Sequence, residues 1–501
     1  MNILFHINHP AQFHLLKNTL FDLEQAGYKI KIIARQKDVL TQLLDEAELD
    51  YINVLPEGKK TNMLSLFISQ VKQYLKIKKI AQKFKPELLV GTSFILPFVS
   101  RKLNIPFINL VEDDHAVIPF YATITYRFST IILAPEVCQT GKWKTKKIGY
   151  NGYHELAFLH PNHFTPNKKI AQKFLDLSRK NFFIRFTSFT AHHDYGKQGI
   201  SKDIATEIID LLSHYGDVHI SSEAELPDKF HRYKLKIPTG DIHHLLAHCD
   251  LVIGDSQSMA MEAGVLGIPS IRINDYADKI SVLEELEHKY KLTVAFQPNK
   301  KEEILDKVNE YLTDKDLKST FTQRKTQLIK DKIDVRQLLT WLLSNYPSSS
   351  ERLKKDKEYQ YRFGGTKELK TESYIKTRKR NFTISPLLIY LCLLMIAYIF
   401  PQSKSITLNN YNLLDIRLDH LFHVIALIPI PILIYIKIRK NRFKWSVTLA
   451  ASFLIAILLE FIHLLVPYRA FTFPDLISNG IGVMIGYLII YIMKHKKPSK
   501  K

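Results

Sequence analysis

The fold is decided by the stretch CDLVIGDSQSMAMEAGVLGIPSIR, residues 249–272. A short apolar strand, Leu251–Ile253, precedes a glycine and then a helix from about Ser258 to Leu266. Gly267-Ile268-Pro269 leads into a second strand, Ser270–Ile273. Two apolar strands joined by a helix indicate a parallel sheet with helices on both faces.

The same alternation of strands and helices extends towards the N-terminus. A strand at Asn2–Ile7, a helix at Leu15–Ala26 and a strand at Lys29–Ala34 open the chain, and a second series begins after Tyr153. We therefore expect an α/β protein with two doubly wound, Rossmann-like lobes, residues 1–150 and 151–346. Ligands of such folds bind beyond the carboxyl ends of the strands.

Charge and cysteine content narrow the class of protein. The 501 residues carry a net charge of +21 and three cysteines without metal-ligand spacing, so no disulfide framework is expected. The N-terminus reads as a strand rather than a signal peptide. Basic residues gather at 347–380, at 437–444 and in the C-terminal tail, which predicts contact with anionic membrane lipids. Without a basic helix or an aromatic-interleaved motif, no nucleic-acid partner is expected.

The last quarter of the chain predicts a membrane domain. A polar, basic linker at 347–381 precedes a four-helix transmembrane α domain at 382–496. Its four apolar runs are Pro386–Phe400, Leu418–Ile436, Trp445–Val466 and Leu476–Met493. The basic loops all fall on one side of an even number of spans. The positive-inside rule therefore predicts a multi-pass protein of the bacterial inner membrane, with the lobes and both termini cytoplasmic.

The deciding stretch also holds a candidate nucleotide site. Ser256, Gln257 and Ser258 stand at the mouth of its helix, where free backbone N–H groups favour an anion such as a diphosphate. Glu262 follows one turn after Ser258 and can accept both ribose hydroxyls of a nucleotide. In the alternative interpretation, Ser256 only caps the helix and Glu262 lies on a solvated face.

Candidate catalytic residues lie in the first lobe. His14 begins the first helix and suits removal of a proton from an acceptor hydroxyl, while Asp114 and His115 follow a strand on the same rim. Each histidine could instead be a hydrogen-bonded structural residue. Arg185 could clamp a phosphate, or it could pair with Asp194.

Ionisable residues within the apolar runs are functional candidates because charge is costly in hydrocarbon. With the predicted orientation, six polar residues collect at the outer ends of the spans: Asp419, His423, Glu460, Arg469, Asp475 and Asn479. They could recognise a polar headgroup. Alternatively, they could pair with one another to pack the helices.

Several of these motifs resemble known families. The stretch 249–272 looks like the donor lobe of GT-B glycosyltransferases and of non-hydrolysing UDP-GlcNAc 2-epimerases. Residues 1 to about 345 resemble family 354 of the domains of unknown function, described as predicted glycosyltransferases. The matching pieces are Asn8–His14, Glu112–Ala116, Tyr150–Glu155, Arg185 with His192-His193-Asp194, and Gly254–Ala263. Ser256-Gln257-Ser258 departs from the paired glycines that such lobes often carry.

The membrane region, Asp419 to about Met493, resembles the VanZ-like family. The resemblance rests on Asp419-x-x-x-His423, Glu460-x-x-His463, Arg469 and the run from Asp475 to Gly482. His463 stands where such proteins often have glutamine. The family is linked by name to glycopeptide resistance and the cell envelope.

Taken together, the residues and the resemblances predict a membrane-anchored glycosyltransferase of GT-B-like architecture. It would move a sugar from a nucleotide-sugar donor, most simply a UDP-sugar, to a lipid-linked or cell-envelope glycan acceptor. Because no Asp-x-Asp motif ends a strand and no His-Glu-x-x-His occurs, the chemistry is expected to need no metal or other cofactor. The alternatives are a UDP-sugar 2-epimerase and a non-catalytic nucleotide-sugar sensor coupled to a lipid-binding membrane domain.

Overall fold

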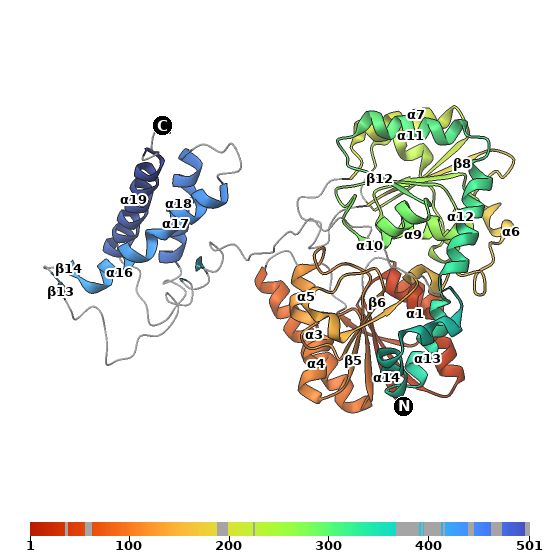
Figure 1. Cartoon of the computed structure of the whole chain (residues 1–501), viewed down its shortest axis with the longest axis horizontal. Coiled ribbons are helices and arrows are strands. Elements are labelled where there is room, and N and C mark those ends of the chain that lie inside the picture. The colour runs from red at the N-terminus through yellow and green to blue at the C-terminus, as the bar shows by residue number, and fades with distance from the viewer. Residues whose placement is uncertain are drawn as a thin grey trace. The chain divides into compact units, whose positions relative to one another are not determined.

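The structure is a computed structural model that divides into two compact units, Met1–Lys376 and Thr377–Lys501, which we call the N-terminal and C-terminal units (Figure 1). It describes residues 1–35, 39–55, 63–187, 199–223, 226–366, 390–391, 394, 412–413, 416–438, 445–461 and 473–495.

The first lobe is built on a seven-stranded sheet with the strand order β3-β2-β1-β4-β5-β6-β7, in which every neighbouring pair is parallel. Its strands are β1 (Asn2–Ile7), β2 (Lys29–Arg35), β3 (Tyr51–Leu55), β4 (Leu88–Gly91), β5 (Phe107–Leu110), β6 (Ile131–Pro135) and β7 (Lys147–Tyr150). Strands β4, β5 and β6 are buried along their whole length, which is why they read as continuous apolar runs.

Helices cover both faces of the first sheet. Alternate residues of β1 enter different cores: Ile3 and Phe5 pack on the side of α1 (Pro10–Gln25) and α2 (Leu40–Glu46), and Leu4 packs on the other. That other side carries α3 (Met63–Phe84), α4 (Leu96–Leu103) and α5 (Pro119–Thr125). Figure 1 shows α3, α4 and α5 on one side of the sheet and α1 on the opposite side.

The second lobe contains a five-stranded parallel sheet in the order β12-β11-β10-β8-β9. Its strands are β8 (Asn181–Phe186), β9 (Asp217–Ser222), β10 (Leu251–Gly254), β11 (Ser270–Ile273) and β12 (Val294–Phe296). Helices α7 (Lys202–Ser213) and α11 (Lys301–Thr313) cover one face. Helices α8 (Ile242–Leu246), α9 (Gln257–Leu266) and α10 (Ser281–Glu284) cover the other. The prediction of two doubly wound lobes is confirmed.

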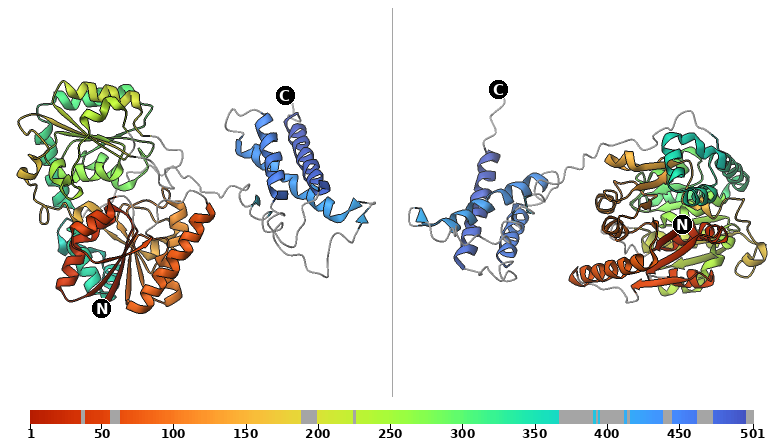
Figure 2. Two further views of the ribbon diagram at one scale, coloured as in Figure 1. Left: turned by 180° about the vertical axis from the view of Figure 1, so that it is seen from behind. Right: turned by 90° about the horizontal axis from the view of Figure 1, so that it is seen from below.

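Helices α9 and α10 lie between the second sheet and the first lobe, as Figures 1 and 2 show from opposite sides. Their apolar residues Ala263 and Leu283 belong to the same buried cluster as Leu16 and Leu20 of α1. The two lobes therefore share a continuous hydrophobic core.

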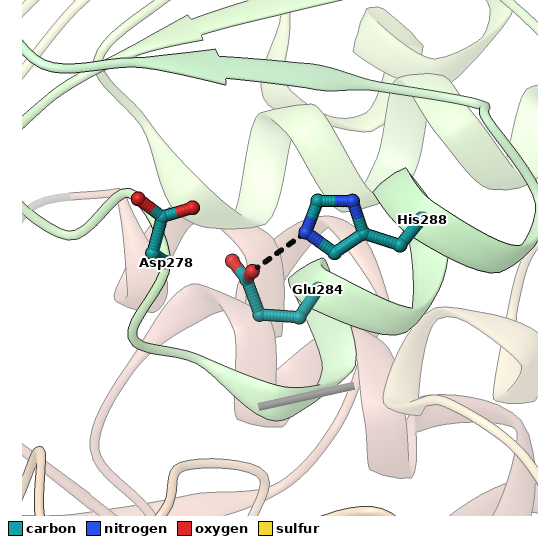
Figure 3. A group of neighbouring side chains, drawn as sticks. All are labelled: Asp278, Glu284 and His288. Carbon is teal, nitrogen blue, oxygen red and sulfur yellow. Dashed lines mark hydrogen bonds and ion pairs between the residues drawn. The ribbon is translucent and has the colours of Figure 1, made fainter. Parts of the chain in front are cut away.

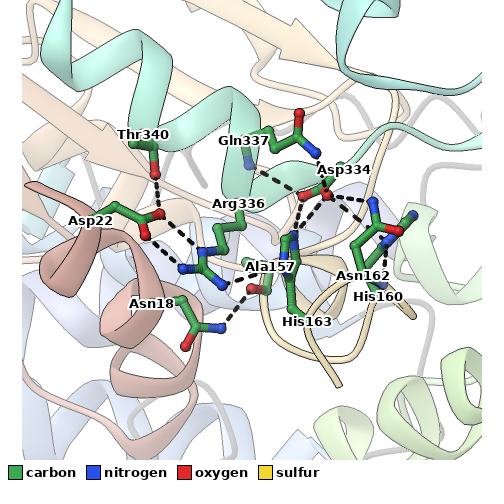
Figure 4. A network of polar contacts seen from close by, with 10 residues as sticks. All are labelled: Asn18, Asp22, Ala157, His160, Asn162, His163, Asp334, Arg336, Gln337 and Thr340. Carbon is green, nitrogen blue, oxygen red and sulfur yellow. Dashed lines mark hydrogen bonds and ion pairs between the residues drawn. The ribbon is translucent and has the colours of Figure 1, made fainter. Parts of the chain in front are cut away.

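The chain returns to the first lobe after α12 (Leu317–Asp331). Helix α13 (Val335–Ser344) packs against α1, and α14 (Ser348–Lys355) and the turn η7 (Lys357–Phe363) follow. The Arg336 guanidinium on α13 donates to both carboxylate oxygens of Asp22 on α1, at 2.9 and 2.6 Å (Figure 4). Here the structure differs from the expected linker at 347–381, because residues 348–363 are folded onto the N-terminal unit.

In the C-terminal unit, α19 (Phe473–His495) packs against α16 (Leu418–Leu427), α17 (Pro429–Ile438) and α18 (Trp445–Phe461). Side chains at Gly482 and Gly486 would collide with backbone carbonyls of Val424 and Ile428, so these glycines permit close helix packing, as their spacing predicts. A short strand pair, β13 (Asn412–Leu413) and β14 (Ile416–Arg417), precedes α16.

Among the described residues, one helix is long and apolar enough to cross a membrane, at Phe473–Ile492, and shorter apolar helices lie at His420–Tyr435 and Thr448–Glu460. The second predicted run is divided into α16 and α17 just before Pro429, which cannot donate a helical hydrogen bond. The first predicted run, Pro386–Phe400, lies largely outside the described residues. Four spans and their orientation therefore remain predictions.

A buried ion pair joins the two points where the chain crosses between the lobes. Lys332, on the return crossing, donates from Nζ to Glu285 Oε2 at 2.7 Å and to Asn151 Oδ1 at 3.0 Å. The Tyr153 hydroxyl, on the outward crossing, donates to the same Glu285 oxygen at 2.5 Å. Lys332 and Glu285 are each only 2% exposed, so neither charge has water as an alternative partner.

We predict that Lys332→Met destabilises the N-terminal unit by about 3–5 kcal/mol, because it removes the closest cation of the buried Glu285 carboxylate and leaves, among the described residues, only Lys289, at 3.9 Å from the other oxygen. Urea unfolding followed by tryptophan fluorescence measures this, in a Trp445→Phe background that restricts the signal to the N-terminal unit. Adding Glu285→Leu should recover part of the loss.

The control is Lys301→Met, which breaks an exposed pair with Glu207 and should change the unfolding free energy by less than about 1 kcal/mol. A Lys332 variant that loses no more stability than this control would contradict a role for the buried pair.

Candidate functional site

The mouth of α9 lies directly beyond the carboxyl end of β10. Gly254 ends the strand so close to β8 that a Cβ there would lie 2.8 Å from the Arg185 carbonyl oxygen. Ser256 is the N-cap residue, and its Oγ accepts from the Met259 N–H at 3.3 Å. Gln257 and Ser258 form the first turn, whose amides have no acceptor within the helix. The capping role proposed for Ser256 is therefore present, and the first-turn amides are placed as an anion site requires.

Glu262 is buried at the interface between the lobes rather than solvated. Its Oε2 atom lies 3.4 Å from Nε2 of His243 on α8. The His243 ring packs edge-on against the ring of His14 from α1, with centroids 4.9 Å apart, and Phe158 contacts both rings. The structure thus brings together the predicted base and the predicted ribose ligand through His243, which the sequence analysis did not single out.

The imidazole of His14 is held neutral by its surroundings. Burial lowers its pKa well below the ordinary value, and the nearby His243, Lys17 and His9 lower it further. A general base must be neutral before it takes a proton, and the lowered pKa keeps this imidazole neutral while making it a weaker proton acceptor than a free one.

Two further carboxylates lie beside this group, Glu155, which is buried, and Glu112, which is partly buried. Glu112 follows β5 and accepts from the His154 N–H at 2.8 Å, while Glu155 lies in the turn η2 (His154–Ala157). Burial raises the pKa of Glu112 to about 8, and the neighbouring Asp113 adds to the rise while the His154 bond opposes it. Burial also raises the pKa of Glu155, with contributions from the charges of Glu112 and Glu262. Glu112 can therefore hold a proton near neutral pH, and the pKa of Glu155 is shifted in the same direction.

Asp114 and His115 have structural partners. Asp114 Oδ1 accepts from the Gln139 N–H at 2.6 Å and from the Ser281 hydroxyl at 2.8 Å, and Oδ2 accepts from the Ser281 N–H at 2.7 Å. Because Ser281 begins α10, this carboxylate ties the first lobe to the second. His115 Nδ1 lies 3.1 Å from the Gln139 carbonyl, and its ring packs against Gly141.

Arg185 is engaged on its own sheet. Its Nη1 donates to Ser221 Oγ at 2.6 Å, and its Nη2 pairs with Glu223 beyond the end of β9. The predicted alternative partner Asp194, together with His192 and His193, lies outside the described residues.

One group of side chains in the N-terminal unit has the ligand types of a metal site. Atoms of Asp278, Glu284 and His288 lie within 4.8 Å of one another (Figure 3). However, the guanidinium of Arg272, which is fully buried, lies 3.9 Å from Glu284 Oε1. This cation neutralises the carboxylate that a divalent metal would need. We therefore describe Glu284 as the centre of an ion-pair network with Arg272 and His288.

The helices of the C-terminal unit gather four of the six predicted polar residues. His423 Nδ1 donates to Asn479 Oδ1 at 3.0 Å, and Asn479 Nδ2 donates to Glu460 Oε2 at 3.1 Å. Asp475 lies 2.9 Å from Nδ1 of His420, a neighbour that the sequence analysis missed although it precedes His423 by one helical turn. We call these five residues the polar cluster.

The other two of the six predicted polar residues lie partly or wholly outside the described part of the structure. Asp419 lies in α16, with its side chain outside the described part of the structure, and Arg469 is outside it entirely. The polar cluster is compatible both with helix packing and with headgroup recognition.

Comparison with known proteins places both units in families. Residues 1–336 match the family described as "Protein of unknown function (DUF354)". The chain belongs to the DUF354 family. Residues 387–494 match the VanZ/LLP1 family. No curated protein matches the chain.

Solved structures resemble the N-terminal unit in fold. The UDP-GlcNAc 2-epimerase from Neisseria meningitidis bound to UDP-GlcNAc is 16% identical, with a TM-score of 0.52 over 69% of this chain and 100% of its own. The enzyme from Methanocaldococcus jannaschii, in complex with UDP-GlcNAc and UDP, is 15% identical, with a TM-score of 0.50 over the same shares. These likenesses establish a GT-B-like fold for this DUF354 protein.

We predict that the Glu112 carboxyl contributes stability to the N-terminal unit that is lost as pH rises from 4.5 to about 8. Over this window the folded protein keeps the Glu112 proton that the unfolded chain releases near 4.5. Glu112→Gln carries no such proton, so the melting temperature of the parent minus that of the variant should decrease as pH rises through this window. Thermal unfolding at a series of pH values measures the difference.

Glu155→Gln should change the difference from the parent in the same direction, because the pKa of Glu155 is also raised. Identical slopes for the parent and both variants would contradict the assignment of these buried acids.

Proposed function

We propose that this protein is a nucleotide-sugar-dependent enzyme, and that its reaction is glycosyl transfer. The single observation that carries the proposal is the contact of His14, His243 and Glu262 across the lobe interface, directly beyond the carboxyl ends of both sheets. A GT-B-like fold binds ligands in this position. The donor's diphosphate would lie on the first-turn amides of α9, and Glu262 would accept the ribose hydroxyls.

The side chains suit a direct displacement at the anomeric carbon. The His14 imidazole would take the proton from the acceptor hydroxyl as that oxygen forms its bond to the sugar. The bond between the sugar and the diphosphate would break, and the amides of α9 would stabilise the departing negative charge. In this step His14 receives the proton of the acceptor hydroxyl, and the amides of α9 face the negative charge of the departing diphosphate.

The buried acids favour a second candidate reaction. Burial raises the pKa of both Glu112, to about 8, and Glu155, and a sugar epimerase needs acid and base carboxylates around one sugar ring. Both comparison structures are UDP-GlcNAc 2-epimerases. The unit would then invert one carbon of a UDP-sugar and would need no acceptor.

We further propose that the enzyme works at the bacterial inner membrane, with the lobes and both termini cytoplasmic. The VanZ/LLP1 match and the apolar helix at Phe473–Ile492 support this location. A membrane-bound transferase would take a lipid-linked or cell-envelope glycan as its acceptor. The polar cluster of the C-terminal unit would then bind a polar headgroup.

We predict that Glu262→Gln weakens UDP-sugar binding by roughly 10-fold to 100-fold, because a hydrogen bond to a charged group contributes about 1.5–3 kcal/mol. Isothermal titration of the detergent-solubilised chain with a panel of UDP-sugars measures the affinity. The exposed variant Glu303→Gln, on α11, serves as the matched control. Equal affinity for all three proteins would exclude Glu262 from the site.

Radiolabelled UDP-sugars separate the two reactions. Offered to membranes that contain the protein, they should give lipid-extractable label if glycosyl transfer occurs, and His14→Ala should abolish it. A soluble isomerised sugar without extractable label would favour the epimerase instead. Binding without either product would favour a sensor and contradict both enzymatic proposals.

A further inference from the structure

One face of the first lobe is covered by helices that carry exposed apolar side chains and contain no Asp or Glu. Helices α3, α4 and α5 cover this face, which we call the acid-free face (Figure 1). Its exposed apolar residues, between 38% and 70% accessible, are Ile68, Val71, Leu75, Phe94, Phe98 and Phe120. On α3 they recur at a spacing of three and four residues, which places them on one outward stripe. Exposed apolar residues that gather on one face of a folded protein are typical of an interaction site.

The apolar residues gather near one edge of the sheet. A helix that follows a parallel strand begins at the carboxyl edge, so the first turns of α3, α4 and α5 all lie there. Ile68 and Val71 fall in the early turns of α3, Phe94 lies two residues before α4, and Phe120 is the second residue of α5. The rings of Phe94 and Phe120 lie 5.9 Å apart, which joins the α4 and α5 parts of the face.

Charge distinguishes this face from the opposite one. Helices α3, α4 and α5 and the adjoining turn η1 (Gly141–Lys146) contain ten Lys or Arg residues and no Asp or Glu. Helices α1 and α2 on the other face contain four Asp or Glu residues and one lysine. Cations border the aromatic rings, with Arg101 5.0 Å from the Phe128 centroid and Lys142 5.2 Å from that of Trp143.

We propose that the acid-free face binds the surface of an anionic bilayer, with its apolar side chains inserted at the headgroup boundary. Apolar residues bordered by cations, without acidic residues between them, complement such a surface and repel few of its charges. The same chain supplies the apolar helix α19 and a VanZ/LLP1 match, so a bilayer is the partner for which the chain itself provides evidence. This inference rests on the proposed membrane location, but not on the identity of the reaction.

Docking of the acid-free face on a bilayer would fix the orientation of the candidate site relative to the membrane surface. Glu112 follows β5 and His14 lies in the second turn of α1, so both belong to the carboxyl edge at which the acid-free face begins. A lipid-linked acceptor could then reach this edge while its lipid remained in the membrane.

Fluorescence quenching of the full-length protein in vesicles tests the proposal. An environment-sensitive dye is attached to Phe120→Cys, and vesicles of phosphatidylcholine with or without phosphatidylglycerol carry a nitroxide-labelled lipid. The matched control is Gln42→Cys, exposed in the first turn of α2 on the opposite face. Ile481→Cys on α19 reports whether the chain has entered the bilayer.

We expect quenching at 120 and 481 but not at 42 in anionic vesicles. The quenching at 120 should be lost in neutral vesicles and in the variant Lys72→Glu with Lys142→Glu. Quenching at 481 without quenching at 120, or equal quenching at 120 and 42, would overturn the proposal. An unquenched label at 481 would instead refute the membrane location itself, and the docking proposal with it, while the binding of UDP-sugars could still be intact.

Discussion

The parallel pairing of every strand in the two lobes is the constraint on which the candidate site depends. In a parallel sheet, each connection to the following helix leaves from the carboxyl edge, and here the carboxyl edges of both sheets meet at the lobe interface. Asp114 after β5 bonds to Ser281 at the start of α10, which fixes this meeting. The buried ion pair of Lys332 with Glu285 provides a second contact that holds the lobes together, at the point where the chain returns from the second lobe to the first. Side chains from α1, α8 and α9 can contact one another only because the lobes are held in this way.

Much of the fold could be predicted from local sequence. Strands buried on both faces read as apolar runs, and the helices between them begin and end at recognisable residues, such as Ser256 and Gly267 around α9. The return of α13 and α14 to the first lobe could not be predicted. It depends on contacts across more than 300 residues, such as Arg336 with Asp22. Neither residue differs in sequence context from an ordinary surface charge.

The candidate site was predictable in its region but not in its details. Glu262 and His14 were singled out from helix position, and they do converge, but the residue between them, His243, has no motif of its own. In the run Glu112-Asp113-Asp114, three adjacent acids follow one strand, and sequence alone gives no reason to prefer one. The structure separates them because Asp114 accepts from the Ser281 amide of α10, while Glu112 accepts from the His154 amide. In the C-terminal unit, His423, Glu460, Asp475 and Asn479 converge because charge in an apolar helix must find a partner.

The most direct test of a nucleotide sugar bound between the lobes is an experimental structure of the full-length protein with a UDP-sugar. We expect the diphosphate on the amides of Gln257 and Ser258 and the ribose hydroxyls on Glu262, with the sugar between His14 and the buried acids. A nucleotide bound elsewhere, or a first turn of α9 closed off by the protein's own side chains, would contradict this account.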